Sequence, residues 1–257
     1  MPKRIRLVDL SLPLEPVPFD NRMNPKITYT AHVGSAEGVA QTFQCSVEDL
    51  PDRQGWAVEW VELSTHSGTH LDATWHYGPT SEGKRAITID EVPLEYCYSD
   101  GVVLDFRHKR PGEGITPEDL QGALQRIKYE LKPLDIVLIM TGADKLWGKP
   151  EYFTSFPGNT RESTLWLTQE KGIKVTGTDA WGWDRPFEVI AEEFRRTGNR
   201  AVIWGGHFAG RVKEYFHIEK MAHLDRLPPF GFKVACFAIP VSRASAGWVR
   251  PVAIIEE

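Results

Sequence analysis

A regular alternation of strand-like and helix-like segments between residues 100 and 207 is the feature that most constrains the fold. Two continuous apolar runs, DGVVLDF at residues 100–106 and DIVLIMTG from Asp135, are typical of strands that a sheet buries on both faces. Between them, Thr116 supplies a helix N-cap and Pro117 a favourable first helical residue. Apolar residues then recur at helical spacing until Pro133, namely Leu120, Ala123, Leu124, Ile127 and Leu131. This pattern predicts layered α/β structure.

Two more helix–strand rounds follow. A helix is expected near residues 162–171 before the strand GIKVTGTDA, and another over 187–196 before the strand RAVIWGG, which ends at His207. Other stretches predict further strands: RIRLVDLSL, KITYTAHV, WAVEWVELST, FKVACFAIPV and VRPVAIIE. We therefore expect a mixed β-sheet core with flanking helices. Four prolines within residues 13–25 predict an extended N-terminal arm, over about residues 10–25, of a single domain that spans 1–257.

The composition argues against several classes of partner. The 257 residues are 41% hydrophobic and 25% charged, with a net charge of −5, which is ordinary for a soluble globular protein. No basic face suggests nucleic acid, and no apolar run approaches the roughly 20 residues that a membrane-spanning helix needs. Cys45, Cys97 and Cys236 are far apart and odd in number, which argues against a disulfide framework. We expect a cytoplasmic protein without a nucleic-acid or membrane partner.

The stretch HSGTHLDATWH, residues 66–76, contains three of the chain's eight histidines. His70 and Asp72 are two positions apart and share a face if the backbone is extended. Gly68 permits a tight turn that would bring His66 toward them. Two imidazoles and a carboxylate are a suitable ligand set for Zn²⁺ or Mn²⁺ and leave a position for water. The alternative is a polar loop whose histidines only form hydrogen bonds, and spacing alone leaves both readings open.

A second polar group follows about 140 residues later, in GGHFAGRVKEYFHIEKMAHLDRLP. His207 directly follows the expected strand AVIWGG, and strand ends are where catalytic groups gather. Glu219 lies in a stretch that looks helical, where a surface glutamate is the ordinary expectation. The group also contains His217, His223 and Asp225, to which no role is assigned. The presence of two such groups favours a metal site over a polar loop.

Together the two groups resemble the cyclase family, which includes bacterial kynurenine formamidase and isatin hydrolase. The family pattern H-x-G-T-H-x-D-x-P-x-H aligns with residues 66–76, except that Thr74 stands where the pattern has proline. The opening LVDLSLPL and the closing stretch from Glu219 are also similar to the family. In that closing stretch, Lys220 and His223 stand in place of the two asparagines of E-N-L-x-N-L. The resemblance implies a swivelling β/β/α single domain and a metal-dependent hydrolase.

The resemblance also implies roles for individual residues. It assigns a first metal to His66, His70 and Asp72, and a second metal, bridged by Asp72, to His207 and Glu219. It assigns His76 to proton transfer rather than to metal binding. The cofactor is then one or two divalent ions per subunit, zinc or manganese, since nitrogen and oxygen ligands suit both. Family members are commonly dimers or larger, so the resemblance further implies a homo-oligomer.

The expected chemistry is the opening of an amide, lactam or lactone bond of a small aromatic or cyclic substrate by metal-activated water. Aromatic residues expected to line the substrate site are Phe19, Trp75, Trp181 and Trp183. Two alternatives use the same ligands: a metal-holding binding protein without turnover, and a metal-assisted cyclase or dehydratase. No G-x-S-x-G elbow supports a serine hydrolase, and neither a P-loop nor a dinucleotide-binding glycine motif is present.

Overall fold

A computed structural model describes residues 4–17 and 23–257. These residues form two compact units. The larger unit contains the described residues up to Leu14 together with Thr65–Glu257, and the smaller unit contains Glu15–Ser64. The single domain expected from the sequence remains a prediction. Within the expected arm, residues 10–17 contain no helix or strand apart from a β-bridge between Ser11 and Met221.

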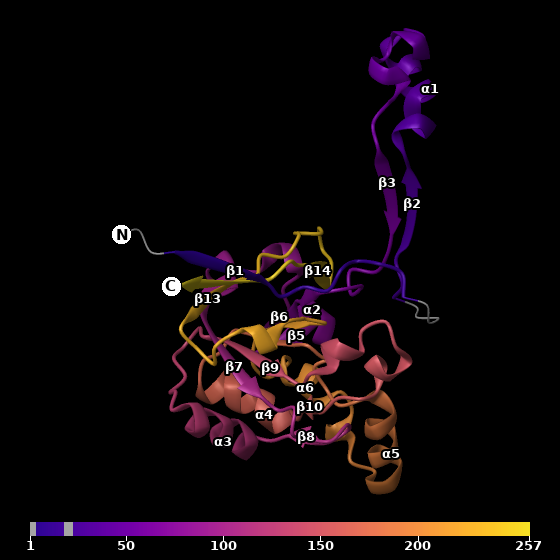
Figure 1. Cartoon of the computed structure of the whole chain (residues 1–257). Coiled ribbons are helices and arrows are strands. Elements are labelled where there is room, and N and C mark those ends of the chain that lie inside the picture. Colours follow the sequence, from indigo (N-terminus) through magenta and orange to yellow (C-terminus); the bar gives the residue numbers. More distant parts are fainter. Residues whose placement is uncertain (1–3, 18–22) are drawn as a thin grey trace. The chain divides into compact units, whose positions relative to one another are not determined.

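The larger unit is built on a mixed sheet (Figure 1). Its described strand order is β1-β15-β13-β7-β9-β11-β12-β4-β14. These strands are β1 Ile5–Asp9, β4 His70–Asp72, β7 Tyr98–Asp105, β9 Ile136–Met140, β11 Val175–Thr178, β12 Phe216–Glu219, β13 Phe232–Ala235, β14 Ala246–Trp248 and β15 Val252–Glu256. The neighbours β7, β9, β11 and β12 are parallel, and the other neighbouring pairs are antiparallel. The expected mixed α/β sheet is confirmed, and it curves into a half-barrel.

Helices and short ladders surround this sheet. The helices of the larger unit are α2 Thr74–Tyr77, α3 Pro117–Ile127, α4 Arg161–Leu165, which continues as a π-helix over Trp166–Glu170, α5 Phe187–Thr197 and α6 Gly205–Ala209. The short ladders pair β5 Thr80–Ser81 with β6 Lys84–Arg85, and β8 Gly114–Ile115 with β10 Gly158–Asn159. Among the described residues, no helix is both long and apolar enough to cross a bilayer.

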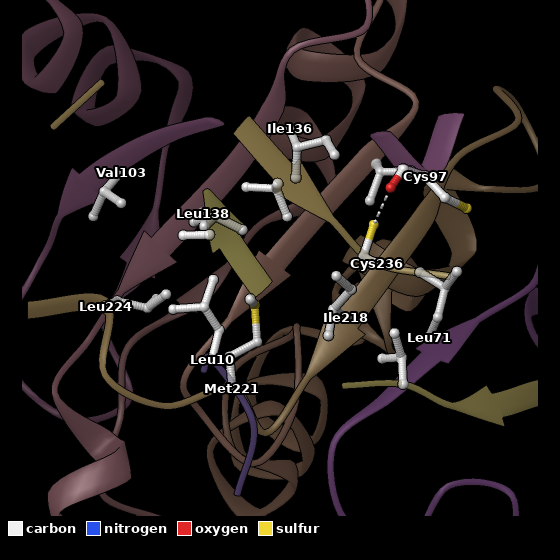
Figure 2. Packing of buried hydrophobic residues seen from close by; sticks show 14 of the residues in the cluster. Leu10, Leu71, Cys97, Val103, Ile136, Leu138, Ile218, Met221, Leu224 and Cys236 are labelled. Carbon is white, nitrogen blue, oxygen red and sulfur yellow. Dashed lines mark hydrogen bonds between the residues drawn. The ribbon is translucent and has the colours of Figure 1, made fainter. Parts of the chain in front are cut away.

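Apolar side chains are packed on both faces of the sheet. One cluster takes alternate residues from the strands and from the segments beside them, including Leu10, Leu71, Val103, Leu138, Ile218 and Met221 (Figure 2). The other cluster takes the intervening residues and packs them against α3; it includes Val102, Leu104, Leu120, Leu124, Val137 and Ile139. Adjacent strand residues point to opposite faces. The strands β7 and β9 are therefore buried on both sides, as their continuous apolar sequences indicate.

The smaller unit is a two-stranded ribbon that carries a helix. Strand β2, Lys26–Thr30, pairs antiparallel with β3, Val58–Glu62, and α1, His32–Phe43, lies at the end of the ribbon where β2 ends and β3 begins (Figure 1). The sequence predicts strand through residue 33, but α1 begins at His32 and is held by buried Ala36, Val39 and Ala40. Two glycines inside α1 weaken its helical signal in the sequence, because glycine is a poor helix former.

Three further expectations are wrong. Residues 200–206 form no strand, because Arg200–Val202 is a 3₁₀ turn and α6 begins at Gly205. Trp204, the residue directly before α6, has a left-handed φ of 49°, which a regular strand does not accommodate. Glu219 lies on β12 and not on a helix. Helix α3 starts at Pro117 as expected but ends before Lys128, whose φ of 54° closes it ahead of Pro133.

Candidate metal centre

Strand β4 presents His70 and Asp72 on one face, because side chains two positions apart along a strand point the same way. The turn before β4 contains His66 and Gly68, whose φ of 61° is the left-handed conformation that glycine adopts freely. His66 Nδ1 lies 2.9 Å from Asp72 Oδ1, and His70 Nε2 lies 3.2 Å from the same oxygen. Asp72 Oδ1 therefore lies beside both imidazoles, as the sequence indicates. The group on this side whose ligand atoms all lie within 4.8 Å of one another is nevertheless His66, Asp72 and His76. The assignment of His66, His70 and Asp72 as ligands remains a prediction.

Helix α2 directly follows β4 and turns His76 back toward the same carboxylate. His76 Nε2 lies 3.7 Å from Asp72 Oδ2. Thr74, which stands where the family pattern has proline, is the first residue of α2, a position that favours proline because its N–H has no helical partner. The Thr74 hydroxyl secures this turn in another way, by accepting a hydrogen bond from the Ile87 backbone N–H at 2.9 Å.

Strand β12 brings in the second polar group because it pairs antiparallel with β4. The register places His217 opposite Asp72, and Glu219 opposite His70. Residues directly opposite each other in an antiparallel pair have side chains on the same face. His217 Nε2 accordingly lies 3.1 Å from Asp72 Oδ2, and Glu219 Oε2 lies 3.7 Å from His70 Nε2. Strand register is therefore what joins two segments that are far apart in sequence.

His207 reaches the cluster from α6. Its Nε2 lies 3.4 Å from Glu219 Oε1 and 3.7 Å from Asp72 Oδ2. Its Nδ1 lies 2.5 Å from Asp184 Oδ2, and the Asp184 carboxylate also accepts hydrogen bonds from the backbone N–H groups of Gly206 and His207. Asp184 thus fixes both the start of α6 and the orientation of the imidazole, with Nε2 aimed at the other carboxylates.

Several buried polar atoms of this cluster have no hydrogen-bond partner among the described residues: His70 Nε2, His217 Nε2 and both carboxylate oxygens of Asp72. Such atoms are normally paired. His70 Nδ1 lies 2.9 Å from the Gly68 carbonyl oxygen, which only accepts, so Nδ1 carries a proton and the neutral ring presents the Nε2 lone pair to Asp72. A lone pair that faces a carboxylate is repulsive unless a cation lies between them. The nitrogen and oxygen donors therefore fit a divalent metal ion.

The two carboxylates are held in their charged form. Burial would raise the pKa of Asp72, but His76, His70 and other imidazoles hold that pKa well below its usual range. Burial opposes ionisation of Glu219 as well, and His207, His217 and Lys220 keep its pKa well below the usual value. The site therefore offers two buried anions, which is the charge that a divalent cation requires.

The histidines respond to burial in opposite ways. Burial lowers the pKa of His76 to about 3, even though Asp72 favours its charged form. Burial also opposes the charge on His207, yet its bonds to Asp184 and Glu219 raise its pKa to about 9. In the metal-free chain His76 is therefore neutral at pH 7 and His207 holds a proton. A metal ion at His207 would displace that proton, since a metal-bound imidazole must be deprotonated.

Solvent reaches the cluster from one side. The His66 and His76 side chains are 14% and 23% exposed, whereas those of His70, Asp72 and His217 are fully buried. Beside this opening, the buried ammonium group of Lys220 donates a hydrogen bond to the His66 carbonyl oxygen at 3.1 Å. The cluster is therefore accessible to solvent on the side of His66 and His76 and is enclosed on the side of β12.

The aromatic residues expected at the substrate site occupy different environments. Trp75 is 44% exposed beside His76, and half-buried Trp181 lies 5.4 Å from the Lys220 ammonium group. Trp183 is fully buried, with its Nε1 donating to Thr164 Oγ1 at 3.0 Å and its ring stacked on His217. It supports the cluster from the core. Phe19 lies outside the described residues. Contacts of these residues with a substrate remain predictions.

Three residues at the site receive no role in the sequence analysis. Asp184 orients His207, and His217 faces Asp72. The Trp204 ring stacks on His207, with centroids 4.0 Å apart, and lies edge-on to His76 at 5.0 Å. Only His217 has a sequence signal, because it precedes Glu219 by two residues just as His70 precedes Asp72. The pairing of β4 with β12 makes these two H-x-acid patterns neighbours.

Comparison with known proteins places this site in a family. The family model described as "Putative cyclase" matches residues 8–185. The chain belongs to this cyclase family. Cyclase-like protein 1 of Arabidopsis thaliana is 24% identical over 147 residues, 56% of this chain and 54% of that protein. Isatin hydrolase of Roseibium aggregatum is 22% identical over 209 residues, 78% and 75% of the two chains.

Kynurenine formamidase of Bacillus thuringiensis is a further relative of this cyclase-family chain, 26% identical over 119 residues, which are 46% of this chain and 49% of that protein. The matches to this formamidase and to Cyclase-like protein 1 thus span about half the length of those relatives.

Solved structures with the same fold cover nearly the whole chain. An isatin hydrolase bound to the product analogue thioisatinate has a TM-score of 0.75 at 20% identity and covers 98% of this chain and 93% of its own. A structure described as a potential metal-dependent hydrolase with cyclase activity has a TM-score of 0.63 at 18% identity and covers 99% and 100%. At these identities the similarity establishes the shared fold.

Proposed function

We propose that this cyclase-family chain is a metal-dependent hydrolase that opens an amide, lactam or lactone bond of a small aromatic or cyclic substrate. The observation that carries the proposal is the convergence of imidazole nitrogens on both oxygens of one buried carboxylate. Oδ1 of Asp72 is approached by His66 and His70, and Oδ2 by His207 and His217. Relatives named isatin hydrolase and kynurenine formamidase support hydrolysis of a carbon–nitrogen bond.

The metal that faces solvent would be held by His66, His70 and Asp72. Bound there, a zinc or manganese ion would lower the pKa of a coordinated water toward ~7 and polarise the substrate carbonyl. Three protein ligands are what a catalytic site uses when positions must remain for water and substrate. The partial exposure of His66 lets both approach from solvent.

His76 is the group that we assign to proton transfer. Its imidazole is partly exposed and lies beside Asp72, whose charge favours the protonated ring, so His76 is placed to accept the proton of the attacking water. The water oxygen bonds to the carbonyl carbon, the bond to nitrogen or ring oxygen breaks, and His76 returns the proton to that leaving atom. The Asp72 carboxylate, 3.7 Å away, stabilises the imidazolium while it holds the proton.

A flat substrate is supported by the aromatic surroundings of the open side. Trp75 flanks His76, Trp204 lies edge-on to it, and Trp181 packs near the Lys220 ammonium group. Aromatic side chains favour planar ligands through stacking and edge contacts. We therefore propose Trp75 and Trp181 as substrate contacts, with Phe19 as a further candidate. Buried Trp183 would support the site indirectly, through its stacking on His217.

The test combines metal analysis with a substrate panel. The purified protein would be stripped with a chelator, reloaded with Zn²⁺ or Mn²⁺, and assayed on an aryl formamide, on isatin and on an aromatic lactone. Metal-dependent hydrolysis of at least one class supports the proposal. Failure to bind either metal would overturn it.

Two alternatives have distinct outcomes in this experiment. Tight binding of the panel compounds without turnover would indicate a metal-holding binding protein. A product that retains or gains a ring, identified by mass spectrometry, would indicate a cyclase or dehydratase with the same ligands. The position of His76 favours hydrolysis over silent binding, because a binding protein has little need of a proton-transfer group.

We also propose that the chain forms a homo-oligomer. Apolar side chains of the smaller unit are strongly exposed, with Tyr29 at 70% and Trp60 at 73%. A two-stranded ribbon is marginally stable in water unless another surface covers it. A cytoplasmic location is proposed on the basis of three free cysteines, Cys45, Cys97 and Cys236.

A further inference from the structure

The strand residue His217 is held between two aromatic rings at the closed side of the cluster. Its ring stacks on Tyr77, with centroids 5.3 Å apart at 21°, and on Trp183, with centroids 5.5 Å apart at 14°. The side chain is fully buried. Its ring orientation is therefore fixed by packing, and the two ring nitrogens face different surroundings.

The hydrogen bonds of the neighbouring hydroxyl groups determine which nitrogen carries the proton. Tyr215 Oη donates its only proton to the Gly206 carbonyl oxygen at 2.7 Å. The contact of 3.2 Å between Tyr215 Oη and His217 Nδ1 therefore requires Nδ1–H as the donor. Tyr77 Oη, 3.1 Å from the same nitrogen, has the Asp72 carbonyl oxygen as an acceptor for its own proton. A neutral His217 thus presents a lone pair at Nε2.

The Nε2 atom points at two acceptors and has no hydrogen-bond partner among the described residues. It lies 3.1 Å from Asp72 Oδ2 and 3.3 Å from Glu219 Oε1. His207 Nε2 faces the same two oxygens, and its own Nδ1 is bound to Asp184. When His207 Nε2 gives up its proton to make room for a metal ion, four electron-pair donors converge, and these four atoms all lie within 4.8 Å of one another.

The nitrogen–oxygen separations within this group are close to those between neighbouring ligand atoms of one metal ion. Ligand atoms about 2.0–2.1 Å from a tetrahedral zinc ion are about 3.3 Å apart from each other. The observed nitrogen–oxygen separations are 3.1, 3.3, 3.4 and 3.7 Å. These four separations are therefore close to the spacing of ligands around a metal ion.

We propose that His217 is the fourth protein ligand of a second, closed metal site, which it forms with Asp72, His207 and Glu219. This inference rests on the proposed function and assigns different roles to the two metal sites. The closed site has four protein ligands, as structural metal sites do, and the three-ligand site at His66, His70 and Asp72 stays open for water and substrate. Asp72 would serve both sites, because His66 and His70 approach its Oδ1 whereas His207 and His217 approach its Oδ2.

The test is metal titration of the stripped, full-length protein. Zn²⁺ would be added in competition with a chromophoric chelator, and bound metal would be counted by elemental analysis after gel filtration. We expect two ions per wild-type chain. We expect one tight ion in His217→Phe, because phenylalanine keeps the stacking on Tyr77 and Trp183 but offers no nitrogen. The second ion should bind at least 10-fold more weakly. Loss of a residue that only hydrogen-bonds to a metal ligand already lowers metal affinity about 10- to 100-fold, and loss of the ligand itself should cost no less.

Two more variants separate ligation from packing. Tyr215→Phe keeps the ligand but removes the acceptor that orients it, so it should weaken the second ion within that 10- to 100-fold range and leave the first unchanged. His108→Gln removes an exposed histidine outside the cluster and should bind as wild type does. Replacement of zinc by Co²⁺ gives a readout independent of activity, because the intense visible bands of tetrahedral cobalt should be lost in His217→Phe. If His217→Phe fails to fold by circular dichroism, His217→Gln serves in its place.

The possible results test the role of His217 as a ligand and the proposed hydrolase function separately. A wild-type chain that binds no metal overturns both. A wild-type chain that binds a single ion with equal affinity in His217→Phe overturns the second site only, and the hydrolase proposal stands with one ion. Two ions bound equally well by wild type and His217→Phe would show that His217 is not a ligand of the second ion.

Discussion

Asp184 accepts a hydrogen bond from Nδ1 of His207 at 2.5 Å while its carboxylate also accepts two backbone N–H groups at the start of α6. One side chain therefore sets both the position of a short helix and the direction of the imidazole that the helix carries. Removing the charge of Asp184 should disturb the metal site even though Asp184 would not touch a metal.

We expect Asp184→Asn to lower zinc affinity about 10- to 100-fold while the protein remains folded, because an outer carboxylate raises the basicity of the imidazole and fixes its tautomer. The measurement is competitive zinc titration, with folding followed by circular dichroism. The matched control is Asp225→Asn, which removes an exposed carboxylate paired with Lys145. Equal affinities in the two variants would contradict a positioning role for Asp184.

The role of His76 can be separated from that of a ligand. We expect His76→Ala to retain the metal content of the wild type and to lose about 10²- to 10⁴-fold in kcat, the usual contribution of a positioned acid–base group. Both quantities would be measured on the same preparation, with His108→Ala as the control. Loss of metal would reassign His76 as a ligand, which its 3.7 Å separation from Asp72 Oδ2 permits. Unchanged turnover would exclude it from the reaction.

The sequence predicts the fold well where local pattern and burial agree. The apolar runs over β7 and β9, and the capped start of α3, are found as expected because each signal is local. It fails at residues 200–206, where an apolar run of strand character is interrupted by the left-handed Trp204 and becomes the short helix α6. Such a reversal is decided by tertiary contacts, here by Asp184 binding the first N–H groups of the helix.

In the candidate site, too, only the residues that are close in sequence could be predicted to act together. His66, His70 and Asp72 are recognisable because they are close in sequence, whereas the part of His217 depends on the register of β12 against β4. Lys220 and His223, which replace the two asparagines of the family pattern, show a constraint on the backbone. Both have left-handed φ values, 58° and 60°, and asparagine, which the family pattern has at these positions, tolerates that conformation well. The departure from the pattern thus concerns the backbone as well as the side chains.

The exposed ribbon of the smaller unit gives a prediction about assembly. We expect Tyr29→Ser combined with Trp60→Ser to shift the protein toward monomers, because buried tyrosine and tryptophan at interfaces commonly contribute about 2 kcal/mol or more, roughly 30-fold in Kd. The measurement is sedimentation velocity over a concentration series. Glu62→Gln, on the same strand and with its side chain 84% exposed, is the control. A monomeric wild type would contradict the proposed oligomer, and an unaltered oligomer in the double variant would place the interface elsewhere.

Asp179, at the end of β11, gives a prediction about pH. Its buried carboxylate accepts hydrogen bonds from the backbone N–H groups of Thr141 and Gly142 and from the Thr141 hydroxyl. Burial outweighs these bonds and raises the pKa of Asp179 to about 7. Between about pH 4 and 7 the folded chain therefore binds a proton that the unfolded chain lacks, so the free energy of unfolding should fall as pH rises through this range.

We expect the wild type to lose about 2–3 kcal/mol more stability than Asp179→Asn between pH 5 and pH 8, since asparagine does not titrate. Urea unfolding of both proteins, each stripped of metal, would measure this difference and cancel the contributions of groups that they share. The variant should also be less stable at every pH, because its amide N–H₂ would face the Gly142 N–H in place of an acceptor. Parallel pH profiles would mean that the three donors keep Asp179 ionised in the folded chain.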